Sequence, residues 1–247
     1  MTNITYVTFL LKVDDDRVDP DTRIEWLKPL LTLNIDLILF TDEFYRSKIP
    51  VVSNPRLRVA IIDKNSLSTL QAIKNAGPLH LPQTRNHEKD TLNFLSLMNV
   101  KPELLVIAKG VATTPYLAYL DAGLSKVLKT PTETLKRLET LSVKNIPLIL
   151  LPGCHPIQER QGFPDLWRGI HWMLSGGFFV VPKTCVDEFY DLHMKTLNKY
   201  LDMKAITWEV NVWAAFAASV KSRIVWYHGP HTDEMITAIP QSVILAA

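Results

Sequence analysis

Short apolar runs that alternate with helical patterns constrain the fold of this chain more than any other feature. The runs have the length of buried strands and lie at residues 4–11, 36–41, 57–62, 116–121, 146–151 and 224–227. Helical periodicity is present at residues 21–33, 88–111, 131–143, 186–200 and 208–219. Such alternation is typical of α/β proteins with a mostly parallel sheet. We therefore predict a Rossmann-like, mostly parallel central sheet flanked by helices.

Composition limits the class of protein. The chain has 247 residues without an internal repeat or linker, so we expect residues 1–247 to form a single domain. The formal net charge of +2 and the absence of a basic block argue against nucleic acid as a partner. No apolar stretch has the length of a transmembrane segment, and the N-terminal run does not have the pattern of a signal peptide. We therefore expect a cytoplasmic protein, with Cys154 and Cys185 reduced.

The apolar run at 116–120 ends in Asp121, which is followed by Ala122 and Gly123. An acid at the carboxyl end of a central strand points into the crevice where open α/β sheets bind ligands. A carboxylate there can hold a hard metal ion. The alternative is a strand-end aspartate that stabilises the next turn.

Two later segments also carry candidate chemistry. Gly176 and Gly177 lie within a strand-like run, which indicates either a close approach of the backbone to a ligand or a β-bulge. Glu209 begins a helical pattern among aromatic and apolar residues. It could be a catalytic base in a desolvated pocket or an acid favoured by the helix dipole.

Histidines surround a Gly-Pro turn near the end of the chain. His228 and His231 could each supply a metal ligand, or both could be solvated loop residues. The chain contains no G-x-G-x-x-G, Walker A, G-x-S-x-G or H-E-x-x-H motif. This argues against dinucleotide dehydrogenases, P-loop enzymes, α/β-hydrolases and zincins.

The order of these segments resembles that of nucleotide-sugar glycosyltransferases of the GT-A type. More narrowly, the chain is similar to the HtrL/YibB-like family of bacterial and giant-virus proteins over most of residues 4–216. The segments that carry the resemblance are 5–11, 23–33, 37–42, 93–109, 114–123, 176–179 and 208–213. Gly123 stands in the place of the second acid of the usual Asp-x-Asp motif.

The resemblance implies a GT-A-like fold with a smaller C-terminal region on the acceptor side. It implies transfer of a sugar from a nucleotide-diphosphate donor, most simply a UDP-sugar, to a hydroxyl of a glycan or glycoconjugate. Mn²⁺ or Mg²⁺ would lie on the diphosphate, held by Asp121 and His228, with His231 as second choice. Glu209 would orient the acceptor hydroxyl or remove its proton, and Asp121 would be the other catalytic residue.

The resemblance also implies which residues contact each substrate. Those expected at the donor are Thr8, Phe9, Arg23, Asp42, Asp121 and Gly123, and those expected at the acceptor or sugar are Gly176, Gly177 and Trp208. Two other hypotheses stay open. One is a catalytically inactive nucleotide-sugar or glycan-binding protein of the same fold. The other is an unrelated hydrolase of a phosphatase-like kind that uses Asp42 or Asp121.

Overall fold

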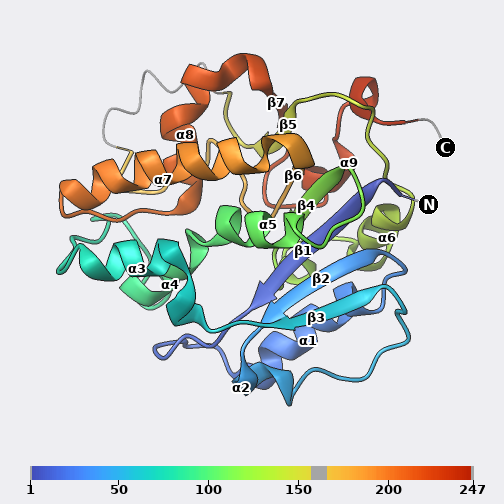
Figure 1. Ribbon diagram of the computed structural model, residues 1–247, viewed down its shortest axis with the longest axis horizontal. Helices are drawn as coiled ribbons and strands as arrows, with labels where there is room; N and C mark the ends of the chain where they lie inside the picture. The colour runs from blue at the N-terminus through green and yellow to red at the C-terminus, as the bar shows by residue number, and fades with distance from the viewer. Residues whose placement is uncertain (1, 157–165, 246–247) are drawn as a thin grey trace.

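The computed structural model describes residues 2–156 and 166–245, and these form an α/β fold around one seven-stranded sheet (Figure 1). The strands are β1 (Ile4–Leu10), β2 (Asp36–Thr41), β3 (Leu57–Ile61), β4 (Tyr116–Leu120), β5 (Ile149–Gly153), β6 (Phe178–Pro182) and β7 (Ile224–His228). Their order in the sheet is β3-β2-β1-β4-β6-β5-β7. The predicted α/β class is confirmed.

Most neighbouring strands are parallel, and β6 is the exception. It runs antiparallel to β4 on one side and to β5 on the other, whereas the other strand pairs are parallel. The first four strands have the 3-2-1-4 arrangement of doubly wound folds. The amino end of β6 therefore lies at the same edge of the sheet as the carboxyl ends of β4 and β5.

Helices cover both faces of the sheet. One face is covered by α3 (Ser68–Asn75), α4 (Leu92–Met98), α5 (Lys101–Lys109), α7 (Val186–Asp202) and α8 (Glu209–Ala217). The other face is covered by α1 (Pro20–Leu31), α2 (Glu43–Arg46), α6 (Pro131–Lys136) and α9 (Glu234–Thr237). Figure 1 shows α5 and α7 side by side over the central strands.

The central strand β1 illustrates why the sequence forms this core. All of its residues are buried, and they alternate between the two faces of the sheet. Tyr6 and Leu10 pack into the core on the α1 side, whereas Val7 and Phe9 pack into the core on the α5 side. A strand that is covered on both faces needs a nearly continuous apolar run, which is the pattern that predicted it.

Three sequence expectations differ from the structure. The helix expected over 131–143 ends at Lys136 and continues only as a short 3-10 turn, Arg137–Glu139. The sequence Thr130-Pro131-Thr132-Glu133 predicts that the Thr130 hydroxyl caps this helix. In the structure the hydroxyl instead donates to the carboxylate of Asp233, to which the Thr130 backbone N–H also donates. Glycines 176 and 177 precede β6 instead of lying inside it, so the β-bulge interpretation is wrong.

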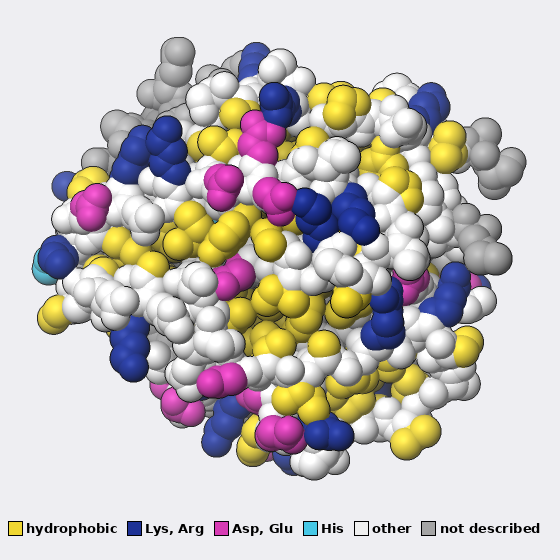
Figure 2. Space-filling view, viewed as in Figure 1, with side chains coloured by type: hydrophobic (Ala, Val, Ile, Leu, Met, Phe, Trp, Pro, Cys, Tyr) yellow, Lys and Arg dark blue, Asp and Glu magenta, His cyan; other side chains and the backbone are white. Residues whose placement is uncertain are grey.

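The surface carries charges of both signs. On the face in Figure 2, basic and acidic side chains are interspersed among hydrophobic ones. Within the part of the chain that the structure describes, the apolar helices are too short to cross a bilayer. The sequence pattern predicts a long loop over 152–169, of which residues 157–165 lie outside the described residues. Pro152 and Gly153 belong to β5 instead.

Candidate functional site

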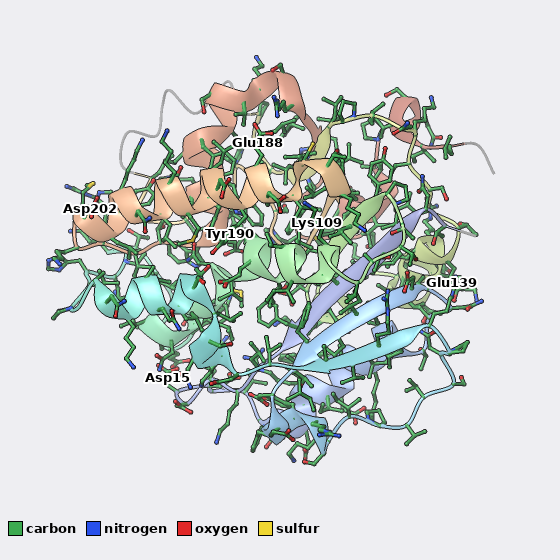
Figure 3. The ribbon with its side chains drawn as sticks, in the orientation of Figure 1. Asp15, Lys109, Glu139, Glu188, Tyr190 and Asp202 are labelled. Atoms are coloured by element: carbon green, nitrogen blue, oxygen red, sulfur yellow. The ribbon has the colours of Figure 1, made fainter. Side chains whose placement is uncertain are left out.

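A cleft opens at the carboxyl ends of β1 and β4. The strand order reverses here, because β2 and β3 lie to one side of β1 and the later strands lie to the other. Such a switch point is where open α/β sheets bind ligands. The cleft holds about 210 Å³, many times the space that one water molecule needs. Figure 3 shows Asp15, which lines it, beyond the carboxyl end of β1, whereas Glu139 lies at the opposite end of the sheet.

The structure brings most of the residues predicted for the site together in this cleft. Those that line it are Phe9, Arg23, Asp121, Gly123, Gly176, Gly177, Trp208 and Glu209. Thr8, Asp42 and His228 are not among the residues that line it. The segments come from the two ends and the middle of the chain, so the cleft exists only in the folded protein.

Asp121 lies on the wall of the cleft directly after β4. Its backbone N–H donates to the carbonyl oxygen of Gly177 at 2.8 Å, which ties the end of β4 to the segment before β6. Its Oδ1 accepts the N–H of Gly123 at 2.8 Å. The turn-stabilising alternative therefore applies to one carboxylate oxygen. Oδ2 is the oxygen left to meet a ligand, since no hydrogen bond to it is present among the described residues.

The floor of the cleft is a buried ion pair between Lys101 and Glu209. Lys101 is 2% exposed and Glu209 is 4% exposed. Lys101 Nζ lies 2.5 Å from Glu209 Oε1 and donates to the carbonyl oxygen of Gly176 at 3.0 Å. It also lies 5.0 Å from the centroid of the Tyr119 ring. Both charges are thus compensated, as burial requires.

The glycine pair has a steric role in this floor. A Cβ atom on Gly176 would lie 2.3 Å from Glu209 Oε1 and 3.1 Å from Lys101 Nζ, so no other residue fits beside the intact ion pair. A Cβ atom on Gly177 would meet the flexible Met235 side chain, at 3.2 Å from its Sδ. Gly176 therefore makes room for a protein side chain. That these glycines contact a sugar or acceptor stays a prediction.

The two candidate histidines differ in position. His228 is largely exposed, with 63% of its side chain accessible, and its Nε2 lies 3.9 Å from Glu234. His231 lines the cleft and packs edge-on against the Trp172 ring at a centroid distance of 4.4 Å. Burial lowers the pKa of His231 to about 4; the positive charge of Lys101 also lowers it, whereas Asp121 opposes the shift. A neutral imidazole thus faces the cleft at pH 7, and His231 replaces His228 as the histidine of the site.

The expected donor contacts of Asp42 and Thr8 find no support in the geometry. Asp42 Oδ1 accepts the N–H of Tyr45 at 2.9 Å and caps α2, and its Oδ2 accepts the N–H of Lys12 at 2.6 Å. Thr8 is fully buried in the middle of β1. The Asp42 carboxylate is therefore occupied within the fold. The Thr8 hydroxyl is buried without a hydrogen-bond partner among the described residues, and Thr8 does not line the cleft.

Of the basic side chains on the outer wall, only Arg23 was singled out from the sequence. Arg23 Nε and Nη2 form a two-pronged contact with Asp16, at 2.5 and 2.7 Å. Lys126 Nζ lies 4.3 Å from the centroid of the Trp26 ring. Lys89 and Arg17 also line this wall. Single charged residues that are far apart in the sequence do not form a recognisable motif. They come together only in the folded protein.

The donors in the cleft fit a divalent metal poorly. Asp121 and His231 offer one oxygen and one nitrogen ligand. Across residues 2–156 and 166–245, no three His, Cys, Asp or Glu side chains gather to hold a metal ion. The ammonium group of Lys126 lies beside Gly123, where a second carboxylate would be expected, and it would repel a cation.

Comparison with known proteins adds no relative to this picture. No family model matches the sequence, and no curated protein matches it significantly.

Proposed function

We propose that this chain is a GT-A-like glycosyltransferase that moves a sugar from a nucleotide-diphosphate donor, such as a UDP-sugar, to a hydroxyl of a glycan or glycoconjugate. The observation that carries the proposal is the cleft at the switch point between β1 and β4, with Asp121 on its wall and the Lys101–Glu209 pair on its floor. The sequence resemblance, which rests on the order of the same segments, supports the choice of donor and reaction.

The chemistry of such a transfer needs two things from the protein. Charge builds up on the diphosphate as it leaves, and it must be balanced. The acceptor hydroxyl must be oriented and must lose its proton. Glu209 is suited to the second task, because it lines the cleft, Lys101 holds its Oε1, and no hydrogen bond to its Oε2 is present among the described residues. Asp121 Oδ2 is placed to accept a hydrogen bond from a sugar hydroxyl.

The resemblance also implies Mn²⁺ or Mg²⁺ at the diphosphate. Asp121 and His231 would be its protein ligands, and such an ion would balance the charge of the leaving group. Since this donor set fits a metal poorly, the cationic side chains of the wall are the other groups that can do so.

A nucleotide-sugar or glycan-binding protein without turnover is the second candidate. One observation favours it: Gly123 replaces the second acid, so the usual metal-binding pair of carboxylates is absent at 121 and 123. Binding and turnover measured on the same protein separate the two candidates.

The test combines thermal stabilisation with product detection. A ligand that binds only the folded state at a hundred times its Kd stabilises it by about 2.7 kcal/mol. We expect one class of nucleotide sugar to raise the melting temperature, and release of the nucleoside diphosphate once an acceptor is added. Asp121→Asn should lower this turnover at least about tenfold, because it weakens a hydrogen bond to the reacting sugar.

Asp202→Asn is the matched control, because Asp202 is exposed at the end of α7 (Figure 3) and does not line the cleft. Its turnover should equal that of the wild type. Stabilisation without product under any acceptor would favour the binding protein. If no nucleotide or nucleotide sugar stabilises the chain, both candidates fail. Release of inorganic phosphate from a phosphate ester would support the hydrolase hypothesis instead.

A further inference from the structure

The space beside Gly123 contains a lysine side chain. A Cβ atom built on Gly123 would lie 3.6 Å from both Nζ and Cε of Lys126, and 3.3 Å from Asp121 Oδ1. A carboxylate at position 123 would thus start in contact with the Lys126 amine. The side chain that stands where the second acid is expected is therefore a cation.

Lys126 is held in this position from two sides. It ends the 3-10 turn Leu124–Lys126, and its Nζ lies 4.3 Å from the centroid of the Trp26 ring of α1. An ammonium over the face of an indole ring is favourable. Partial burial lowers the pKa of Lys126, Asp121 offsets part of this shift, and the positive charges of Lys89, Arg23 and Arg17 add to it. A bound anion would relieve the repulsion among these cations.

The other cations of the cleft differ in whether they have partners. Arg23 pairs with Asp16, Arg17 with Glu88 and Lys101 with Glu209. Within the part of the chain that the structure describes, Lys126 and Lys89 form no ion pair. Lys89 lies 5.1 Å from the centroid of the Phe94 ring. Lys126 thus combines a contact with an aromatic ring, a charge without an ion pair among the described residues, and a place next to Asp121.

We propose that Lys126 takes the place of the divalent cation, so that its ammonium group binds the diphosphate of the donor without Mn²⁺ or Mg²⁺. The choice of a nucleoside diphosphate as ligand rests on the function proposed above. Charge-assisted hydrogen bonds from an ammonium to phosphate oxygens are among the stronger polar contacts in proteins. A metal between Asp121 and the diphosphate would instead share its site with this ammonium group.

Calorimetric titration of the full chain with UDP, at pH 7 and with EDTA present, tests this directly. We expect the wild type to bind, and Mn²⁺ in place of EDTA to change its Kd less than about threefold. Lys126→Met should weaken binding about tenfold to a hundredfold, because it removes a charged contact. Lys126→Arg should keep most of the affinity, since the charge is retained. Lys129→Met is the control, because Lys129 is exposed and does not line the cleft.

A second variant reverses the arrangement. Gly123→Asp combined with Lys126→Met restores the second acid and removes the ammonium group, so UDP binding should now require Mn²⁺. Both positions line the cleft, and circular dichroism checks that the variant is folded.

The outcomes separate this inference from the proposed function. Wild-type binding that requires Mn²⁺, or Lys126→Met binding that equals the wild type in EDTA, overturns the role of Lys126 and leaves the glycosyltransferase standing. If the wild type binds neither UDP nor other nucleoside diphosphates under either condition, both are overturned.

Discussion

The cleft has two lysine–acid arrangements that differ in almost every physical respect. On the floor, Lys101 and Glu209 are nearly inaccessible and hold each other and the carbonyl oxygen of Gly176. On the wall, Lys126 and Asp121 line the cleft, and Asp121 raises the pKa of Lys126 although the two form no ion pair among the described residues. In the floor pair, the two charges balance each other within the protein. The wall pair is left incomplete, as expected of groups that meet a ligand.

Because of this difference, mutations in the two arrangements should affect different properties of the protein. Removing one member of a buried pair leaves an uncompensated charge in a poorly solvated place. Removing an exposed charge costs little stability, because water replaces the lost contact. Stability should therefore depend on the floor, and ligand affinity on the wall.

The largest expected effect is that of Lys101→Met. It leaves the Glu209 carboxylate and the Gly176 carbonyl oxygen buried without their partner, which should lower the free energy of unfolding by about 3–5 kcal/mol in urea denaturation. Lys126→Met should lower it by less than about 1 kcal/mol. Equal losses in the two variants would erase the distinction between floor and wall.

A double variant controls for the buried charge. Lys101→Met with Glu209→Gln removes both charges and should recover a substantial part of the stability that Lys101→Met loses. A double variant as unstable as the single one would show that packing around Lys101 matters more than its charge.

The next effect comes from Gly176→Ala. The new Cβ would lie 2.3 Å from Glu209 Oε1, so the ion pair must shift, and we expect a loss of about 1–3 kcal/mol in unfolding free energy. Gly177→Ala is its matched control. There the new atom meets a movable Met235 side chain, and the loss should stay below about 1 kcal/mol. A larger loss at 177 than at 176 would contradict the assigned steric role.

A smaller effect is expected for Asp121→Asn on the wall. The amide oxygen can still accept the Gly123 N–H, so stability should change by less than about 1 kcal/mol. At pH 7 in EDTA, the affinity for UDP should be kept or rise a few-fold, because a negative charge near the diphosphate is removed. Loss of affinity in calorimetry would indicate that Asp121 acts through a bound cation instead.

The smallest effect is a pair of opposite pKa shifts at His231, which lies between floor and wall. Lys101 lowers the pKa of His231 and Asp121 raises it, although burial is the main reason that it lies near 4. NMR titration should therefore show a higher pKa in the variant Lys101→Met with Glu209→Gln, and a lower one in Asp121→Asn. Shifts in the same direction would show that His231 does not report on both arrangements.

The same histidine makes stability depend on pH. Because its folded pKa lies below the ordinary value of about 6.5, the unfolded chain binds a proton more readily. The contribution is complete above the unfolded pKa and is lost as the pH falls from 6.5 towards 4. Buried His193, whose pKa burial lowers to about 3, acts in the same direction.

Much of the fold could be predicted from the sequence, because its signals are local. The strands β1 and β4 are buried on both faces of the sheet, and each appears in the sequence as a short, nearly continuous apolar run. The direction of β6 was not predictable in this way. Pro182 of β6 pairs with Tyr116 of β4, which is far away in the sequence. No local pattern shows whether two such strands run parallel or antiparallel.

Some residues of the site could likewise be predicted from their local sequence, and others could not. Asp121 and Glu209 stand at the end of a strand and the start of a helix, where an acid is conspicuous. Lys101 lies within a largely apolar helical pattern, and its partner is 108 residues away in the sequence. His228 and His231 stand on either side of Gly229 and Pro230. The direction of the turn decides which histidine faces the cleft, and the sequence does not specify that direction.

The adjacency of β1 and β4 has a kinetic consequence. Ile4 pairs with Tyr116, and the cleft at the carboxyl ends of these two strands is completed by Glu209, His231 and Met235. Contacts between such distant segments form late, because a long loop must close before they are gained. During synthesis, the binding site can be assembled only after Met235 has left the ribosome. Recovery of ligand binding should therefore be among the last events of refolding, after the helices have formed.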